Sequence, residues 1–226
     1  QPTDRDFLAA LRARRPAFIC EIKPASPSEG PIRPATAMTE AIASYARHAD
    51  VISVLTDEPF FGGSLALLSR VRAAVEQPVL CKDFVIDPYQ VVEARLAGAD
   101  AILLMLSVLD DRDYRAAAAV ASSLRMGILT EVHSAAELDR ASALGAAAIG
   151  INNRNLATLG VDLATTPDLA AIAPPGALVI AESGIRTRQD ILRLGGLVDG
   201  FLIGTVLMRA AAVDRTLRTL VYGPTK

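Results

Sequence analysis

Eight short apolar stretches recur along the chain, and segments with a helical pattern separate them. Each stretch is five or six residues long and is rich in Val, Ile, Leu and Ala. A continuous apolar run of this length is typical of a strand that is buried on both faces, as in a parallel sheet. The eight predicted strands are residues 18–23, 51–56, 79–84, 101–106, 128–132, 147–152, 178–183 and 201–205.

The intervals between these stretches predict helices. The clearest is residues 135–146, where Leu138 and Ala141 lie on one side and charged residues lie on the other. Another helix is expected to begin at Pro88, because proline suits the first helical turn. It should end at Gly98, because glycine commonly follows the last turn of a helix.

Eight strands that alternate with eight helices predict an α/β protein, a (β/α)8 TIM barrel that forms a single domain over residues 1–226. Barrels of this size are common as one domain, and no low-complexity linker divides the chain. A doubly wound open sheet is the alternative fold. It usually needs fewer strands, and no GxGxxG motif follows the first predicted strand.

Composition and charge exclude several classes of function. The 23 Lys and Arg residues nearly balance the 25 Asp and Glu residues, which argues against a nucleic-acid-binding protein. The apolar runs are far shorter than the ~20 residues that span a bilayer, and no targeting peptide is visible. Two cysteines fit a reducing compartment and form no metal-ligand pattern. We therefore expect a cytoplasmic protein that acts on a small molecule, away from membranes and nucleic acids.

Polar side chains end most of the apolar stretches, although charge at the tip of an apolar strand is costly. In a barrel the carboxyl ends of the strands converge at one mouth, where active sites lie. The candidates are Glu21, Lys23, Lys82, Glu131, Asn152 and Glu182. Three carboxylates, two lysines and an amide around one cavity favour acid–base chemistry on a polar, anionic small molecule. Salt bridges that cap the barrel are the structural alternative.

The last two predicted strands indicate a phosphate site. Barrels commonly bind phosphate with the loops after strands seven and eight and with the start of a short helix. Gly184 and Gly204 would let backbone N–H groups approach an anion closely. The hydroxyl groups of Ser183 and Thr205 lie beside them in the sequence.

Seven ordered motifs between Phe18 and Arg209 carry a family resemblance. They are EIKPASPSEG (21–30), LTDEPFFGGS (55–64), LCKDF (80–84), TEVH (130–133), GINNRNL (150–156), ESGI (182–185) and FLIGTVLMRA (201–210). Together they closely resemble the indole-3-glycerol-phosphate synthases, barrel enzymes of tryptophan biosynthesis. The resemblance implies a carboxy-lyase without metal or organic cofactor. Its reaction converts 1-(2-carboxyphenylamino)-1-deoxyribulose 5-phosphate to indole-3-glycerol phosphate, CO₂ and water.

The resemblance implies roles for the charged residues. Lys82 resembles the general acid that protonates the ketone, and a second lysine nearby should make it more acidic. Glu131 resembles the acid–base group of the dehydration, and neighbouring carboxylates should raise its pKa. Glu21 would orient Lys23, which would contact the anionic groups of the substrate. The sequence leaves open whether Lys23 or Lys82 donates the key proton.

Other positions match the family's binding residues. Asn152 should hydrogen-bond substrate hydroxyls or the developing intermediate, and Glu182 should balance the lysines. Arg154 and Leu156 should shape the sixth loop, where Arg154 either binds substrate or holds carboxylates of that loop.

The remaining matches concern the anionic groups and the ring. Ser26 should reach the substrate carboxylate or phosphate, and Phe84 should border the anthranilate ring or pack in the core. Ser183 and Gly184 match the anion-binding turn, and Thr205 stands where the family usually has serine.

Some residues are expected to be structural. His133 should serve the fifth loop, His48 should be a surface or helix-capping residue, and Cys20 should pack outward against a helix. The helix that lies over the mouth in the family should be mostly absent.

The stretch LSVLDDRDY (106–114) and the closing YGPTK resemble bifunctional enzymes fused to phosphoribosylanthranilate isomerase. Such a barrel is therefore an expected fused or associated partner. The competing functions are another phosphosugar barrel enzyme, such as an aldose–ketose isomerase or a tryptophan synthase α subunit, and a catalytically impaired barrel that serves as a scaffold.

Overall fold

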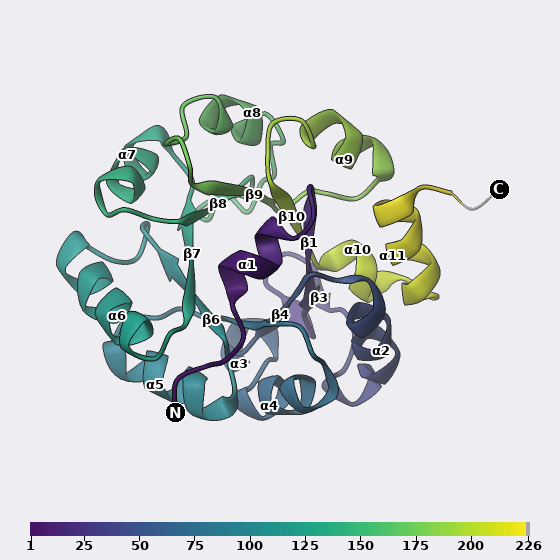
Figure 1. The fold of residues 1–226 in the computed structure, drawn as a ribbon. Coiled ribbons are helices and arrows are strands. Elements are labelled where there is room, and N and C mark those ends of the chain that lie inside the picture. Colours follow the sequence, from purple (N-terminus) through teal and green to yellow (C-terminus); the bar gives the residue numbers. More distant parts are fainter. Residues whose placement is uncertain (225–226) are drawn as a thin grey trace.

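The computed structural model of the protein describes residues 1–224 and contains a closed barrel of parallel strands (Figure 1). Around the barrel, β1 pairs with β10 on one side and with β4 on the other, and every pairing is parallel. The barrel strands are β1 (Ala17–Ile22), β4 (Val51–Leu55), β5 (Val79–Lys82), β6 (Ala101–Met105), β7 (Gly127–Val132), β8 (Ala148–Asn152), β9 (Leu178–Glu182) and β10 (Gly200–Ile203). Each falls on one of the eight apolar stretches, so the predicted barrel is confirmed.

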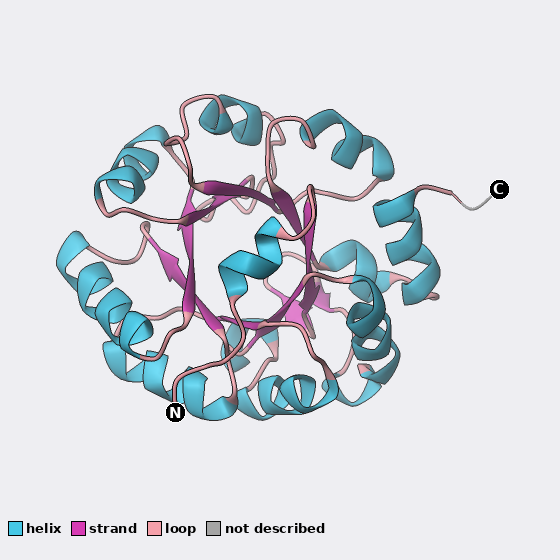
Figure 2. Cartoon of the chain, viewed as in Figure 1, coloured by secondary structure: helices cyan, strands magenta, loops and turns pink. Residues whose placement is uncertain are grey.

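Helices surround the barrel and connect successive strands (Figure 2). The outer helices are α2 (Thr39–His48), α4 (Leu65–Ala74), α5 (Pro88–Ala97), α6 (Asp111–Ser123), α7 (Ala135–Ala143), α8 (Thr165–Ala170), α9 (Arg188–Leu194) and α11 (Val213–Tyr222). Shorter elements are α1 (Phe7–Arg12), β2 (Ala25–Ser26), β3 (Gly30–Pro31), the 3-10 helix η1 (Ala35–Ala37), α3 (Glu58–Phe61) and α10 (Thr205–Arg209). Within residues 1–224, none of these helices is long and apolar enough to cross a membrane.

The ends of α5 illustrate how the sequence sets the connections. Asp87 caps the first turn by accepting a hydrogen bond from the backbone N–H of Tyr89, and the Gln90 side chain completes a capping box. Gly98 ends the helix with a φ of 105°, a conformation that glycine adopts without steric cost. The helix predicted from Pro88 to Gly98 is therefore confirmed.

Side chains alternate along each strand between two apolar layers. On β1, Phe18, Cys20 and Ile22 pack outward in the layer between strands and helices. Ala17 and Ile19 point into the barrel, where the inner layer lies. Cys20 faces the helices, as expected. The same alternation turns Glu21 inward at the carboxyl end of the strand.

Helix α1 closes the barrel at the amino ends of the strands, where it crosses the opening in Figure 1. Phe7 and Leu11 are buried among the inner side chains, and a Cβ on Gly127 would lie 2.5 Å from Cδ1 of Phe7. This helix therefore lies at the end of the barrel opposite the mouth. At the other end of the chain, the last two residues of YGPTK lie outside the described residues.

Candidate active site

A cavity of about 370 Å³ opens at the carboxyl ends of the strands. Every candidate from the sequence analysis lines it. These residues are Glu21, Lys23, Ser26, Lys82, Phe84, Glu131, Asn152, Arg154, Leu156, Glu182, Ser183, Gly184, Gly204 and Thr205. The structure therefore brings together all of the residues that sequence reasoning placed at the mouth.

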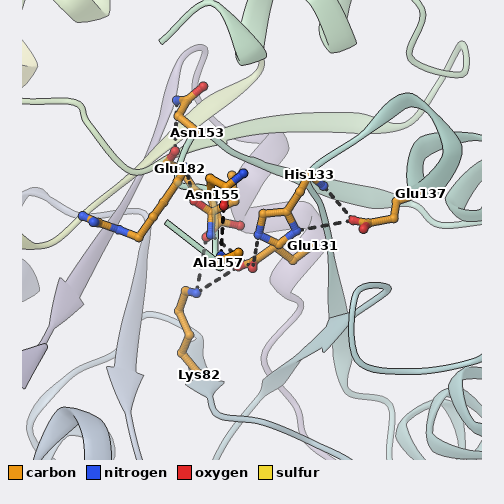
Figure 3. A network of polar contacts seen from close by, with 10 residues as sticks. Lys82, Glu131, His133, Glu137, Asn153, Asn155, Ala157 and Glu182 are labelled. Carbon is orange, nitrogen blue, oxygen red and sulfur yellow. Dashed lines mark hydrogen bonds and ion pairs between the residues drawn. The ribbon is translucent and has the colours of Figure 1, made fainter. Parts of the chain in front are cut away.

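Lys82, the last residue of β5, lies between two buried carboxylates (Figure 3). Its Nζ lies 3.1 Å from Oε2 of Glu131 on β7 and 3.4 Å from Oε2 of Glu182 on β9. The two glutamates are 1% exposed, so neither has solvent to disperse its charge. The ammonium group therefore links two acids on the floor of the cavity.

The charge states of this group differ from the sequence-based expectation. Burial disfavours the charged form of Lys82, but the carboxylates of Glu131, Glu182 and Glu21 outweigh it and raise its pKa above the ordinary value. Burial also disfavours ionised Glu131. Nevertheless Lys82, His133 and a hydrogen bond from Asn152 hold the pKa of Glu131 well below its usual range. The predictions of a more acidic Lys82 and a raised pKa at Glu131 are therefore wrong, because opposite charges surround both groups.

Glu182 has the raised pKa instead. Burial, the largest cause, disfavours its charged form, and together with the negative charges of Glu131 and Glu21 it outweighs the attraction of Lys82, so the pKa of Glu182 is raised to about 8. Its Oε1 atom lacks a hydrogen-bond partner in the part of the chain that the structure describes. Glu182 thus holds a proton near neutral pH, within reach of the Lys82 ammonium group.

A second ion pair stands beside the first. Nζ of Lys23 lies 3.0 Å from Oε1 of Glu21, so the expected pairing of these residues is confirmed in geometry. A Cβ on Gly204 would lie 2.3 Å from the same Oε1, which means that glycine makes room for the Glu21 carboxylate. Glu21 lies on β1, which pairs with β10, and β10 leads into Gly204 and Thr205 of the predicted phosphate site.

Asn152, at the end of β8, is held on both sides of its amide. Its Nδ2 donates to Oε1 of Glu131 over 3.1 Å, and its Oδ1 accepts from the backbone N–H of Arg154 over 2.9 Å. Nη1 of Arg154 donates to the carbonyl oxygen of Leu159 over 2.7 Å. Arg154 thus contacts a backbone carbonyl of the sixth loop rather than a carboxylate, and because it also lines the cavity, its role toward the substrate stays a prediction.

Two adjacent aromatic residues lie at the mouth. The rings of Phe61 and Phe84 have centroids 6.3 Å apart with an interplanar angle of 42°, and both residues line the cavity. Sequence reasoning missed Phe61 and its neighbour Phe60. Helix α3, which carries them, has only four residues and is too short to show a periodic pattern. The signal that could have found them was the FF pair in the short segment that follows the polar end of β4.

The turn after β9 has the conformation expected of an anion-binding loop. Ser183 has a φ of 63° and Gly184 a φ of 79°, so two consecutive residues adopt the left-handed region. Successive backbone groups in such turns can form a concave anion site. Gly204 and Thr205, where α10 begins, line the same cavity and follow β10, the strand next to β9. Ser26 is buried, and its hydroxyl has no hydrogen-bond partner among residues 1–224.

His133 is the least expected polar residue at this site. It follows β7 directly, and its Nε2 lies 3.3 Å from Oε1 of Glu131. The sequence predicted only a structural role in the loop, whereas the side chain contacts a carboxylate of the cavity floor. Within the described part of the chain, no three His, Cys, Asp or Glu side chains are arranged to hold a metal ion.

Comparisons with known proteins show the family to which the chain belongs. The family model described as "Indole-3-glycerol phosphate synthase" matches residues 1–220. Two similar proteins, each called "Tryptophan biosynthesis protein TrpCF", are 50% identical over 99% of this chain. They come from Yersinia pestis and Vibrio cholerae serotype O1. The chain covers 47% and 48% of them, so it spans about half the length of the curated relatives it matches.

A crystal structure of 3-hexulose-6-phosphate synthase superposes with a TM-score of 0.74 at 18% identity, covering 92% of this chain and all of that chain. At this identity the likeness shows the fold alone.

Proposed function

Because the chain belongs to the indole-3-glycerol phosphate synthase family, we propose that it converts 1-(2-carboxyphenylamino)-1-deoxyribulose 5-phosphate to indole-3-glycerol phosphate. The reaction closes a ring, releases CO₂ and then eliminates water, which makes the protein a carbon–carbon lyase. The observation that carries the proposal is the position of Lys82 between an ionised and a protonated carboxyl group on the cavity floor. An acid and a base are thereby available side by side.

Ring closure requires a proton at the ketone oxygen. The aromatic carbon that bears the carboxylate attacks the ketone carbon, and the carbonyl electron pair takes a proton from Lys82 to give a hydroxyl group. We assign this step to Lys82 rather than Lys23 because the Glu182 carboxyl group lies 3.4 Å from Lys82 and can replace the donated proton. The bond to the carboxylate carbon then breaks, CO₂ leaves, and its electron pair restores the aromatic ring.

Dehydration requires a base and an acid. The C–O bond of the former ketone carbon breaks, and a proton leaves the adjacent carbon of the new ring. Glu131 suits the base, because it is ionised and its Oε1 is held by Asn152 while Oε2 faces Lys82. The leaving hydroxyl group takes a proton from the Lys82 ammonium group and departs as water.

The rest of the cavity supplies binding. Phe61 and Phe84 border the anthranilate ring at the mouth, opposite aliphatic residues that include Leu156. The turn at Ser183 and Gly184, together with Gly204 and Thr205, is the proposed phosphate site. The Ser26 hydroxyl, without a protein partner in the described structure, is available to the substrate carboxylate or phosphate. Lys23 contributes positive charge beside them.

We also propose a cellular location and a partner for the enzyme. We place it in the cytoplasm, where its substrate class is metabolised. We also propose a phosphoribosylanthranilate isomerase barrel as a fused or associated partner. The resemblance of residues 106–114 to bifunctional enzymes and the double length of the similar TrpCF proteins support this partner.

The test is a fluorescence assay for indole product with the chain and its Lys82→Ala, Glu131→Gln and Lys23→Ala variants. We expect the Lys82 and Glu131 variants to lose most of kcat, whereas loss of Lys23 should act mainly on KM. Equal activity in all four proteins would overturn the assigned roles. No product from the parent chain would favour the scaffold alternative, and turnover of another sugar phosphate alone would favour the isomerase alternative.

A further inference from the structure

A second cavity, of about 540 Å³, lies on the outer side of the sixth loop. His133 and Glu137 line it but do not line the substrate cavity, whereas Asn152 and Arg154 line both. The two cavities therefore adjoin at the end of β8. His133 and Asn152 both line the outer cavity and contact Glu131, and of these two His133 is the titratable one.

The His133 imidazole lies between two carboxylates (Figure 3). On one side its Nε2 is 3.3 Å from Oε1 of Glu131, and on the other its Nδ1 is 3.3 Å from Oε2 of Glu137. The backbone N–H of His133 also donates to Oε2 of Glu137 over 2.8 Å. Glu137 thus fixes both the backbone and the ring at the start of α7.

The geometry points to His133 as a positioning residue for Glu131, held in place and charged by Glu137 from outside the substrate cavity. Asn152 donates a hydrogen bond to Oε1 of Glu131, and the imidazolium lies at ion-pair distance from the same oxygen, which leaves Oε2 for Lys82 and the substrate. This inference rests on the proposed function, because it names the group whose orientation the reaction needs.

The other charged groups near His133 have contacts of their own and do not take the place of Glu131 and Glu137 beside the ring. Lys82 contacts Glu131 from the far side, at Oε2. Arg140 on α7 contacts Asp111 and the carbonyl oxygens of Leu106 and Leu109. Arg154 and Asp162 line the outer cavity from the sixth loop. The imidazole therefore faces two carboxylates directly, and its positive charge is the one opposite Oε1 of Glu131.

The electrostatics agree with the geometry. Burial disfavours protonated His133, but the hydrogen bond to Glu137 and the negative charges of Glu131 and Glu137 raise the pKa of His133 to about 9. The imidazolium in turn helps to keep the pKa of Glu131 low. Because the His133 ring is charged at neutral pH, it stabilises the ionised form of Glu131 at the pH at which this base must be ionised.

Three variants test the inference. His133→Gln keeps an amide donor near the Nε2 position but removes the charge. Glu137→Gln keeps an oxygen acceptor for the His133 backbone N–H and removes the charge that holds the ring protonated. His48→Gln changes the only other histidine of the sequence, which contacts Asp214 away from both cavities, and is the matched control.

Two readouts are measured on each folded protein. With only two histidines, NMR of histidine-labelled chain resolves both titrations. We expect His133 to titrate near 9 in the parent and at least about one unit lower in Glu137→Gln. In the pH profile of kcat/KM, the acidic limb reports the ionisation of Glu131. His133→Gln should move this limb to higher pH by about one unit, because an opposite charge near a carboxyl group lowers its pKa by about 1–3 units. Glu137→Gln should move it less, and His48→Gln should not move it.

The inference is overturned if His133 titrates near its ordinary value in the parent, or if the acidic limb of His133→Gln coincides with that of the parent. If His133→Gln does not fold, Glu137→Gln decides by the same two readouts, because it leaves the substrate cavity unchanged. If the parent chain makes no indole product, the proposed function fails. The His133 titration in Glu137→Gln then still tests whether Glu137 keeps the His133 ring protonated.

Discussion

Gly150 on β8 lies directly against the carboxylate of Glu182 on β9, so that a Cβ on Gly150 would stand 1.9 Å from Oε1 of Glu182. Neighbouring strands of the barrel bring these two residues together. The absence of a side chain on one strand therefore creates the space in which the next strand places its acid. Gly204 has the same relationship to Glu21 across β10 and β1.

We predict that Gly150→Ala displaces Glu182 and lowers kcat by about 100-fold, because small displacements of catalytic groups have effects of that order. The colliding atom is the end of a side chain, so stability should fall by only about 1–2 kcal/mol. Kinetics and urea unfolding on the same protein measure both. Gly196→Ala, where an added Cβ meets nothing within 4 Å, is the control. Unchanged kcat in Gly150→Ala would show that the position of Glu182 is unimportant.

The strands and the residues of the mouth were predictable from the sequence because side chains alternate along each strand. A polar residue at the end of an apolar run points either into the barrel or toward the helices, and Glu21 points inward as its spacing from Ile19 requires. This alternation accounts for Glu21, Lys82, Glu131, Asn152 and Glu182, which lie at the ends of barrel strands and line the same cavity. The candidates in the loops, such as Ser26 and Arg154, came from the family resemblance and not from this pattern.

The charge states were not predictable in the same way. Sequence shows that three glutamates and two lysines gather at the mouth, but it does not show which groups make contact. Lys82 lies between Glu131 and Glu182, so its pKa rises instead of falling, and Glu182 rather than Glu131 has the raised pKa. Distances that differ by a few ångströms decide these shifts, and they depend on strand register.

His133 and Phe61 were missed for local reasons. The contact between His133 and Glu137 joins residues four apart across a strand–helix junction, where neither the period of a strand nor that of a helix applies. Phe61 lies in a helix of four residues, which is too short for a periodic pattern. In both cases the loop geometry, rather than a repeating element, positions the side chain.

We predict that Phe61→Ala raises KM for the substrate roughly tenfold with a smaller change in kcat. Phe61 packs beside Phe84, and the substrate ring would pack against these two residues. An aromatic pair contributes about 0.5–1.5 kcal/mol of binding free energy beyond the effect of buried area. Steady-state kinetics test this. Tyr89→Ala removes an exposed aromatic ring of α5 that does not line the cavity and should leave KM unchanged. A normal KM for Phe61→Ala would place the anthranilate ring elsewhere.

Helix α1 should support stability without contributing to catalysis, because it closes the end of the barrel opposite the mouth. Phe7→Ala should lower the free energy of unfolding by about 3–5 kcal/mol, the usual cost of removing a buried phenylalanine. The partly exposed Leu8 should cost less when replaced by alanine. Chemical denaturation measures the loss, and kcat/KM of the folded variant should match the parent. A large loss of kcat/KM would contradict this separation of the two ends.

Stability should fall as pH rises from about 6.5 to 9. Over that range the folded chain keeps the proton of His133, whose pKa is about 9, while the unfolded chain releases it near 6.5. Glu182 acts in the same direction, because its pKa is about 8 in the folded chain and near 4.5 when unfolded. Each proton contributes a slope of at most about 1.4 kcal/mol per pH unit.

Urea unfolding at pH 6, 7, 8 and 9 measures this dependence. His133→Gln should flatten the slope between pH 6.5 and 9, and His48→Gln should leave it unchanged. A parent whose stability rises across this range would show that neither group holds an extra proton in the folded state.

The most direct test of the account is to follow the fate of the substrate carboxylate. The purified chain is incubated with 1-(2-carboxyphenylamino)-1-deoxyribulose 5-phosphate labelled with ¹³C in that group, and labelled CO₂ and fluorescent indole product are measured together. We predict one labelled CO₂ for each indole formed, with both signals lost in Lys82→Ala. Retention of the label in the product, or equal rates in the parent and Lys82→Ala, would contradict the proposed chemistry at the centre of this site.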